Sequence, residues 1–184
     1  MPGTGEKKLE NRIDFILYGM NQKKQEVLVA LTVTVEIERE LDVDCSSSDA
    51  FEYLEDVPQS ASNFPNVDKL IDLGKNTYRW EMKKFGVDKY SIQSIYAVKY
   101  SQNKNKGWIK WEPVDGVGNG IVEGSWKIKS NKDKTAHLTF YSKGKLTLPL
   151  PGLIKMLVSP LVVREFSGLV DKYLKNLKKA MSSL

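Results

Sequence analysis

Apolar and polar residues alternate along residues 31–43, the first clearly patterned segment of the chain, with Arg39 as the one exception on the apolar parity. One parity carries mainly aliphatic side chains, and the other carries acidic side chains or threonine. Alternation with period two is typical of a β-strand with one buried face. The pattern therefore predicts a half-buried strand with the inward positions Leu31, Val33, Val35, Ile37, Leu41 and Val43.

Two short helices are predicted directly after this strand. Residues 45–49 offer serine and aspartate side chains, which accept hydrogen bonds from the first free amides of a helix. Proline disfavours helical geometry in the residue before it, so the first helix is expected to end before Pro58. A second helix is expected over residues 59–63, ending near Pro65. The apolar positions of the first helix are Ala50, Phe51, Leu54 and Val57.

Residues 67–149 return to period two and are interrupted by short turn signals. Short connections favour antiparallel neighbours, because parallel pairing needs a long crossover. The segment therefore predicts six strands in an antiparallel meander. The turn signals lie at residues 74–76, 86–88, 103–105, 115–120 and 131–133.

The last part of the chain is predicted to form one long amphipathic helix. Over residues 161–181, apolar side chains recur every three or four positions, and lysines occupy the opposite side. Such a stripe packs one face of a helix against a core. Residues 1–26 are interpreted as an N-terminal extension without an assigned structure, and residues 27–184 as the folded domain.

Three segments of the chain resemble segments of a known protein superfamily with the same predicted order of strands and helices. VEIERELDVDCSSSDAFEYLEDV, WIKWEPVDGVGNGIVEGSWKI and LPLPGLIKMLVSPLVVREFSGLVDKYLKNLKKA resemble the opening strand and helix, the middle hairpin and the final loop and helix of START/Bet v 1-like (SRPBCC) proteins. Within that superfamily the chain resembles polyketide cyclase/dehydrase and coenzyme-Q-binding-like members over roughly residues 33–182. The resemblance implies an α+β helix-grip fold, β-α-α-β6-α, in which a curved antiparallel sheet of about seven strands wraps around the C-terminal helix.

Members of this superfamily hold lipids, isoprenoids, polyketides or other apolar molecules in an internal cavity, and a minority catalyse reactions there. The resemblance therefore implies binding or carriage of a hydrophobic or amphipathic molecule, such as a lipid, an isoprenoid quinone or a polyketide-like compound. Two alternatives stay open. One is a polyketide cyclase or dehydratase acting on such a ligand, and the other is a structural or regulatory module whose core is filled.

Candidate ligand-binding residues follow from the parity of the predicted strands and the apolar stripe of the helix. Aromatic rings offer large apolar surfaces, and tyrosine hydroxyls orient the polar end of a ligand. An ordinary packed core uses the same residue types, so this alternative stays open. The candidates are Tyr78, Trp80, Met82, Tyr96, Val122, Trp126, Leu138 and Phe140 on strands, and Val162, Phe166 and Val170 on the helix.

Arg39 is the one charged candidate, because it occupies the apolar parity of the first strand, between Ile37 and Leu41. A buried guanidinium needs a partner, since an unpaired buried charge is very costly. That partner is either an anionic group of the ligand or an internal carboxylate. The alternatives are a bulge that turns Arg39 outward, or an edge position from which it reaches water.

Catalytic and metal-binding signals are weak, and no catalytic residue, metal or cofactor is predicted. His137 has the parity opposite to Leu138 and is expected on the surface. One histidine and one cysteine cannot supply the usual zinc cluster or Cys/His nucleophile pair. Cys45 is expected to be structural. The glycines at 116, 118 and 120 are interpreted as a turn, because no helix follows to bind a phosphate.

The charge of the chain limits its partners. The formal net charge is +5 with a pI of about 9.1, but basic and acidic residues are interspersed, which argues against nucleic-acid binding. The single cysteine excludes an intramolecular disulfide, and no signal peptide is recognised, so a cytoplasmic location is expected. Residues 144–159 form an apolar segment flanked by lysines, which either contacts an anionic membrane or packs as the start of the last helix.

Overall fold

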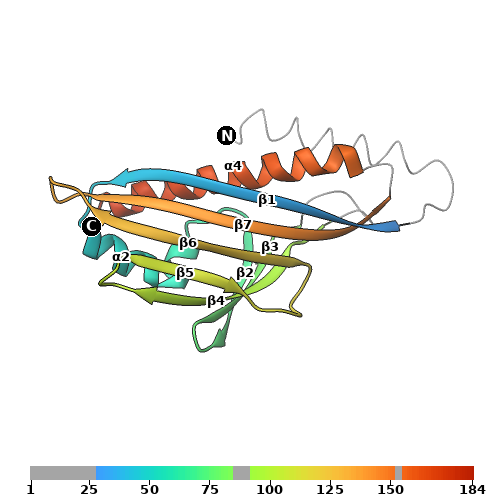
Figure 1. Cartoon of the computed structure of the whole chain (residues 1–184), viewed down its shortest axis with the longest axis horizontal. Coiled ribbons are helices and arrows are strands. Elements are labelled where there is room, and N and C mark those ends of the chain that lie inside the picture. The colour runs from blue at the N-terminus through green and yellow to red at the C-terminus, as the bar shows by residue number, and fades with distance from the viewer. Residues whose placement is uncertain (1–27, 85–91, 152–154) are drawn as a thin grey trace.

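The computed structural model describes residues 28–84, 92–151 and 155–184, so the N-terminal extension and the turn expected at residues 86–88 lie outside the described residues (Figure 1). The chain forms seven strands and three helices over this part. They are β1 (Leu28–Val43), α2 (Ser47–Glu55), α3 (Val57–Ala61), β2 (Val67–Gly74), β3 (Thr77–Met82), β4 (Ile95–Asn103), β5 (Trp108–Pro113), β6 (Gly120–Ser130), β7 (Ala136–Pro151) and α4 (Lys155–Met181).

All seven strands belong to one antiparallel sheet in the order β1-β7-β6-β5-β4-β3-β2. The predicted meander of six strands is confirmed for β2 to β7. The first strand joins the sheet beside the last, and its pairing runs from Leu28 opposite Pro151 to Val43 opposite Ala136. The curved sheet and α4 beside β1 confirm the predicted α+β helix-grip architecture (Figure 1).

Helix α4 packs its apolar stripe on the concave face of the sheet. Val170, Leu177 and Met181 are fully buried, and the Tyr173 ring contacts the sheet residues Trp126 and Phe140. Burial of such a stripe stabilises the fold by about 25 cal/mol per Å² of apolar surface removed from water. The helix begins at Lys155, earlier than the apolar spacing from residue 161 indicates.

The two short helices meet at Asp56, which is earlier than predicted. Ser46 caps α2 by accepting a hydrogen bond from the Asp49 amide at 3.2 Å, and Asp56 caps α3 through the Gln59 amide at 2.9 Å. The first helix ends before Pro58 as predicted, whereas the second, expected over residues 59–63, begins and ends two residues earlier. Proline is well tolerated in the first turn of a helix, where its missing N–H has no partner to lose. Pro58 thus lies in the first turn of α3, directly after Val57.

Gly124 on β6 explains why the Gly-x-Trp pattern contains a glycine. A Cβ atom at this position would overlap with the ring of Trp111 and with the backbone carbonyl oxygen of Tyr141. The Trp111 ring therefore lies directly over the backbone of the neighbouring strand. Only glycine permits that approach.

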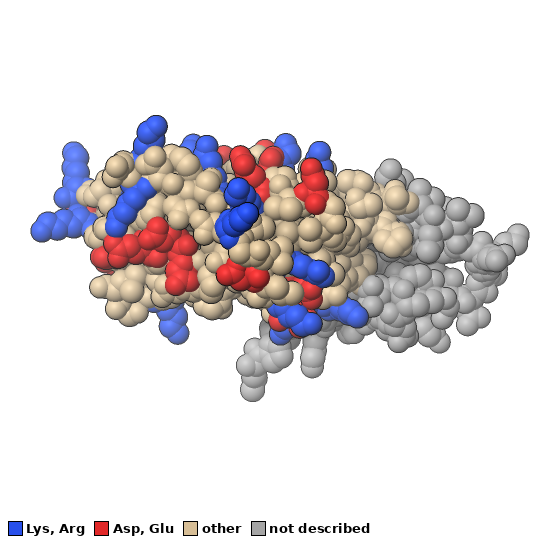
Figure 2. All heavy atoms as spheres, turned by 90° about the horizontal axis from the view of Figure 1, so that it is seen from below, with Lys and Arg blue, Asp and Glu red and all other residues tan. Residues whose placement is uncertain are grey.

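The surface carries both signs of charge. Basic and acidic side chains are interspersed over the face shown in Figure 2, and no strip of one sign dominates it. This distribution agrees with the pattern along the sequence. Within the described part of the chain, no helix is both long and apolar enough to cross a membrane.

Candidate functional site

A cavity of about 60 Å³ lies between the concave face of the sheet and the helices. Its wall comes from every layer of the fold: α2, α3 and α4, the segment after α3, and strands β3 to β7. The lining residues are Leu54, Val57, Ser60, Ala61, Phe64, Trp80, Tyr96, Val98, Tyr100, Ile109, Trp111, Val122, Trp126, Phe140, Ser142, Phe166 and Tyr173.

The structure brings about half of the predicted ligand-binding residues together around this cavity. The other predicted residues lie elsewhere: Val170, Leu138 and Val162 are buried in the core, Tyr78 and Met82 are partly buried at its periphery, and Arg39 lies at the sheet edge. Strand parity identifies the inward face but not the point along each strand where space remains. The predicted residues on the wall are Trp80, Tyr96, Val122, Trp126, Phe140 and Phe166.

Several lining residues were missed from the sequence. Tyr100 and Trp111 continue the inward parity of β4 and β5, and Tyr173 belongs to the apolar stripe of α4, so these three had a usable signal. Ser60 had none, because a serine in a five-residue helix gives no periodic pattern. The short helices close one end of the cavity, which local pattern alone does not reveal.

Aromatic rings fill most of the space around the cavity. The Trp126 and Phe140 ring centroids are 4.9 Å apart, and Trp111 lies 5.8 Å from Phe140. On the other side, Phe64 lies 5.0 Å from the Tyr173 ring centroid. Such contacts contribute about 0.5–1.5 kcal/mol each beyond the burial of their area. The rings therefore form one connected network across the interior.

The volume of the cavity restricts what it holds in this conformation. A cavity of about 150 Å³ accepts benzene, and pockets for larger ligands measure about 300–1,000 Å³. The 60 Å³ found here has room for water or a very small fragment. A larger ligand must therefore displace part of the aromatic network.

Buried hydroxyl groups provide the polar part of the wall. The Tyr173 hydroxyl and the Ser60 hydroxyl are hydrogen-bonded at 2.6 Å. Burial raises the pKa of Tyr173, Tyr96 and Tyr100 well above the ordinary tyrosine value, and the electrostatic influence of neighbouring tyrosines adds to the shift for Tyr96 and Tyr100. All three phenols are therefore protonated at neutral pH. They can donate hydrogen bonds to a ligand but cannot act as bases.

Arg39 does not line the cavity. Its Nε donates to Oδ1 of Asp171 on α4 at 2.9 Å, and the two side chains are 39% and 55% exposed. β1 is an edge strand, so the guanidinium reaches water while its backbone keeps the inward parity. Of the sequence alternatives, the structure shows the edge position together with a carboxylate partner.

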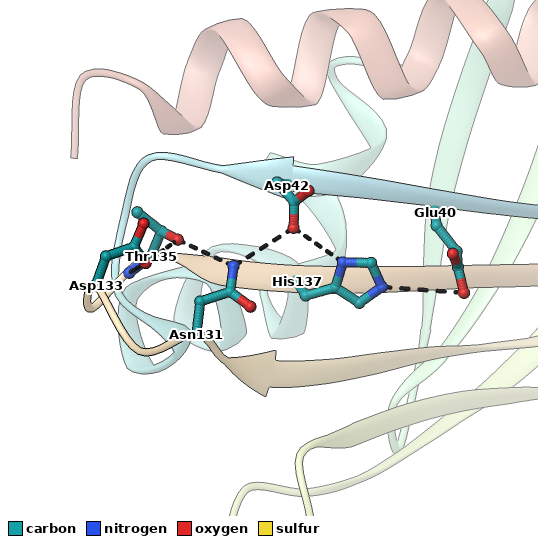
Figure 3. Close-up of polar contacts among 6 residues, drawn as sticks. All are labelled: Glu40, Asp42, Asn131, Asp133, Thr135 and His137. Carbon is teal, nitrogen blue, oxygen red and sulfur yellow. Dashed lines mark hydrogen bonds and ion pairs between the residues drawn. The ribbon is translucent and has the colours of Figure 1, made fainter.

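His137 lies on the opposite face of the sheet from the cavity, as its parity predicts (Figure 3). Its Nδ1 and Oδ1 of Asp42 on β1 are 2.9 Å apart, and its Nε2 lies 3.9 Å from Oε1 of Glu40. Cys45 is buried, and burial raises the pKa of its thiol, which opposes nucleophilic activation. Among the described residues, no group of three His, Cys, Asp or Glu side chains is arranged to hold a metal ion.

We expect the Asp42 cluster to make stability depend on pH in the acid range. Hydrogen bonds from His137 and Asn131 lower the pKa of Asp42, and charges on His137 and Lys178 lower it further. A pKa lowered by folding stabilises the protein above the unfolded pKa, near 3.9, and this contribution is lost as pH falls through the folded value. Asp42→Asn should therefore unfold at lower urea than the parent at pH 7 but not at pH 2–3.

The control for this measurement is Asp115→Asn in the exposed turn between β5 and β6. It should leave the urea midpoint close to the parent at every pH. An Asp42→Asn midpoint that tracks the parent from pH 7 to pH 3 would contradict the expectation.

Comparisons with known proteins agree on the fold. No protein-family model matches the chain, and no curated protein matches it by sequence. The Zhui aromatase/cyclase from Streptomyces sp. R1128 matches with a TM-score of 0.60 at 11% identity, over 80% of this chain and 93% of that one. A START superfamily protein from Mycobacterium smegmatis matches at 0.56 and 15% identity, over 80% and 97%. The di-domain ARO/CYC StfQ from the steffimycin biosynthetic pathway matches at 0.52 and 16%, over 82% and 51%.

The protein therefore has the helix-grip fold of START/Bet v 1-like (SRPBCC) proteins, as the sequence predicts. Proteins described as aromatase/cyclases are among those that share this fold. At these identities the likeness establishes the fold alone. What the protein binds must be argued from the residues of its own cavity.

Proposed function

We propose that the protein binds an uncharged, mostly apolar small molecule in the cavity between its sheet and α3 and α4, and that residues 27–184 form the binding domain. The composition of the wall carries this proposal: the described residues that line it are predominantly aromatic and aliphatic, and none of them is charged. Ligand pockets combine apolar walls with a few polar groups that fix orientation. Lipids, isoprenoid quinones and polyketide-like molecules are the ligand classes that fit this description.

The lack of charged side chains on the wall argues for a neutral ligand. A carboxylate or phosphate that entered the cavity would lose its hydration without gaining an ionic partner, which is very costly. Arg39, the cationic candidate from the sequence, lies outside the wall and is already paired with Asp171. The hydroxyls of Tyr96, Tyr100 and Tyr173 supply neutral hydrogen-bond donors instead.

Binding of a larger molecule requires the cavity to expand. Phe166 on α4 is only half-buried, so its ring can move outward at less cost than the fully enclosed rings. Apolar burial at roughly 25 cal/mol per Å² supplies the driving force for such a rearrangement. The bound state is therefore expected to differ from the free state in the positions of the wall rings.

A cyclase or dehydratase activity is the less supported alternative. The structural likeness to aromatase/cyclases favours it, and tyrosine hydroxyls can polarise a carbonyl group. However, general acid–base catalysis works best with a pKa near the operating pH, and burial moves the pKa values of Tyr96, Tyr100 and Tyr173 away from it. A structural or regulatory module with a filled core is the other alternative, supported by the small volume.

Filling the cavity should abolish binding of a neutral apolar probe. Ala61 on α3 is 5% exposed and lines the wall, so Ala61→Leu places its added carbon atoms in the open space. We expect the parent to enhance the fluorescence of the uncharged probe N-phenyl-1-naphthylamine in a saturable manner. Ala61→Leu should reduce its affinity at least tenfold, while overpacking costs at most about 1–3 kcal/mol of stability. Fluorescence titration and urea denaturation measure the two effects.

Ala30→Leu is the matched control, because Ala30 is exposed on β1 and far from the wall. It should bind the probe like the parent. Native mass spectrometry of the protein purified from its host adds an independent test, since a co-purifying neutral apolar molecule is expected. A clean unliganded mass together with no saturable probe binding would favour the filled-core alternative.

A cytoplasmic location and peripheral contact with an anionic membrane are further proposals, supported by the net charge of +5 and the apolar segment at residues 144–159. Residues 152–154 of that segment lie outside the described residues. Binding to liposomes with anionic lipid should weaken with added salt, because exposed charges are screened over about 8 Å at physiological ionic strength. Equal sedimentation with neutral and anionic liposomes would contradict membrane contact of this kind.

A further inference from the structure

Three side chains with hydrogen-bond donors line the side of the cavity formed by β3 and β4. The donors are Nε1 of Trp80 and the hydroxyls of Tyr96 and Tyr100. The Trp80 and Tyr96 rings are stacked, with centroids 6.2 Å apart and planes 8° from parallel. After burial, the Tyr96 side chain is the next largest cause of the raised pKa of Tyr100, as expected for phenol groups that lie in one buried space.

Trp80 has a buried hydrogen-bond donor that lacks a partner among the described residues. The residue is 8% exposed, and its indole N–H has no hydrogen-bond acceptor among the described residues. The indole N–H lies near the Tyr100 hydroxyl and lowers the pKa of that phenol as a nearby donor does, but the contact does not meet the geometry of a hydrogen bond. An unsatisfied buried donor is rare in proteins and signals a missing partner. That partner is an acceptor atom that enters the cavity from outside.

The hydroxyl groups of Tyr96 and Tyr100 are in a similar position. No described residue accepts a hydrogen bond from the Tyr96 or Tyr100 hydroxyl, whereas the Tyr173 hydroxyl is satisfied by Ser60. The unsatisfied donors therefore gather on the β3 and β4 side, and the satisfied pair lies on the α3 and α4 side. The donors that remain available to a ligand therefore lie on one side of the cavity.

We propose that Trp80, Tyr96 and Tyr100 form the polar anchor of the cavity and bind an uncharged acceptor oxygen of the ligand, such as a ketone or quinone carbonyl. This inference rests on the proposed function, since it specifies the chemistry of the molecule bound there. A carbonyl oxygen has two lone pairs and accepts from two donors at once. A carboxylate is disfavoured because no cation lines the wall. The rest of the ligand lies against the aromatic network.

A pair of shape-matched probes tests the anchor directly. Acetophenone and α-methylstyrene differ in a carbonyl oxygen against a methylene group, and both are neutral and aromatic. Binding is measured by ¹H–¹⁵N NMR of the four tryptophan indole groups, with the Trp80 resonance assigned from its loss in Trp80→Phe. Acetophenone should shift the Trp80 indole resonance downfield at saturation. α-Methylstyrene should change it only slightly.

Removing a hydroxyl from the anchor should weaken one probe selectively. Tyr100→Phe and Tyr96→Phe are each expected to lower the affinity for acetophenone by about 3- to 10-fold and to leave that for α-methylstyrene within about twofold. Both variants should fold, because each removes a hydroxyl that has no protein acceptor. Tyr141→Phe is the matched control, since the Tyr141 hydroxyl bonds Glu36 on the opposite face.

The outcomes separate the anchor from the proposed function. If both probes bind and the anchor variants weaken them equally, the ligand site stands and the carbonyl anchor is overturned. If neither probe binds the parent, the proposed function and the anchor both fail. Selective loss of acetophenone binding, with a shifted Trp80 indole resonance, supports both.

Discussion

Gly124→Ala should destabilise the protein by at least about 3 kcal/mol, because the new methyl group has no free volume. It would overlap with the Trp111 ring and with the backbone carbonyl oxygen of Tyr141. A side chain can shift, but the carbonyl belongs to β7, which is held between β1 and β6. The clash can therefore be relieved only by moving a central strand. Urea denaturation followed by circular dichroism measures the loss.

Gly168→Ala supplies a control in which the same substitution has the opposite sign. Gly168 lies inside α4, and a Cβ atom there would meet no other atom within 4 Å. Alanine should stabilise the helix by about 0.5–1 kcal/mol, because glycine loses more backbone entropy on folding. If Gly124→Ala cost less than about 1 kcal/mol, the Trp111 ring would not be confined over the β6 backbone as described.

Trp126→Ala should destabilise the protein by about 3–5 kcal/mol and create a site that indole fills. Trp126 is 3% exposed and lies between the Phe140 and Tyr173 rings. Its removal joins the space of one indole ring to the existing cavity. Indole at millimolar concentration should then raise the melting temperature of the variant, because a ligand that binds only the folded state stabilises it by mass action. The parent should gain little under the same conditions.

Trp108→Ala controls for a nonspecific effect of indole. Trp108 is half-buried, stacks under the Lys110 ammonium at 5.0 Å, and does not line the cavity. Its loss should cost less stability and should not be rescued by indole. Equal rescue of both variants would show that the effect of indole is nonspecific, and no rescue of Trp126→Ala would show that the region around Trp126 collapses when the ring is removed.

The strand pattern predicted the architecture well because alternation and turn chemistry are local properties. The turn at Gly74 and the turn containing Gly116 both have positive φ angles, as their sequences indicate. Helix boundaries were predicted less well. Pro58 stops a helix or starts one according to its neighbours, and here Asp56 provides the cap that starts α3.

Strand parity predicted some residues of the cavity wall, but it could not predict where open space remains. Trp80, Trp126 and Phe140 follow from parity, because inward positions of a curved sheet must face the helix. The remaining space depends on how the rings interlock, which is a property of packing and not of any one segment. Val170 looked equivalent to Phe166 along the helix, yet it is fully buried away from the cavity. The unsatisfied Trp80 N–H likewise has no trace in the sequence.

The pairing of β1 with β7 also governs how the chain reaches its fold. Thr32 and Thr147, which face each other across these strands, are 115 residues apart in sequence. Contacts this distant slow folding, because the entropy of closing the loop is lost before the contacts form. During synthesis at about 5–20 residues per second, β1 emerges long before its strand partner β7. Its row of aliphatic side chains must therefore stay out of wrong pairings for several seconds, and the alternating acidic residues of β1 provide the charge that opposes them.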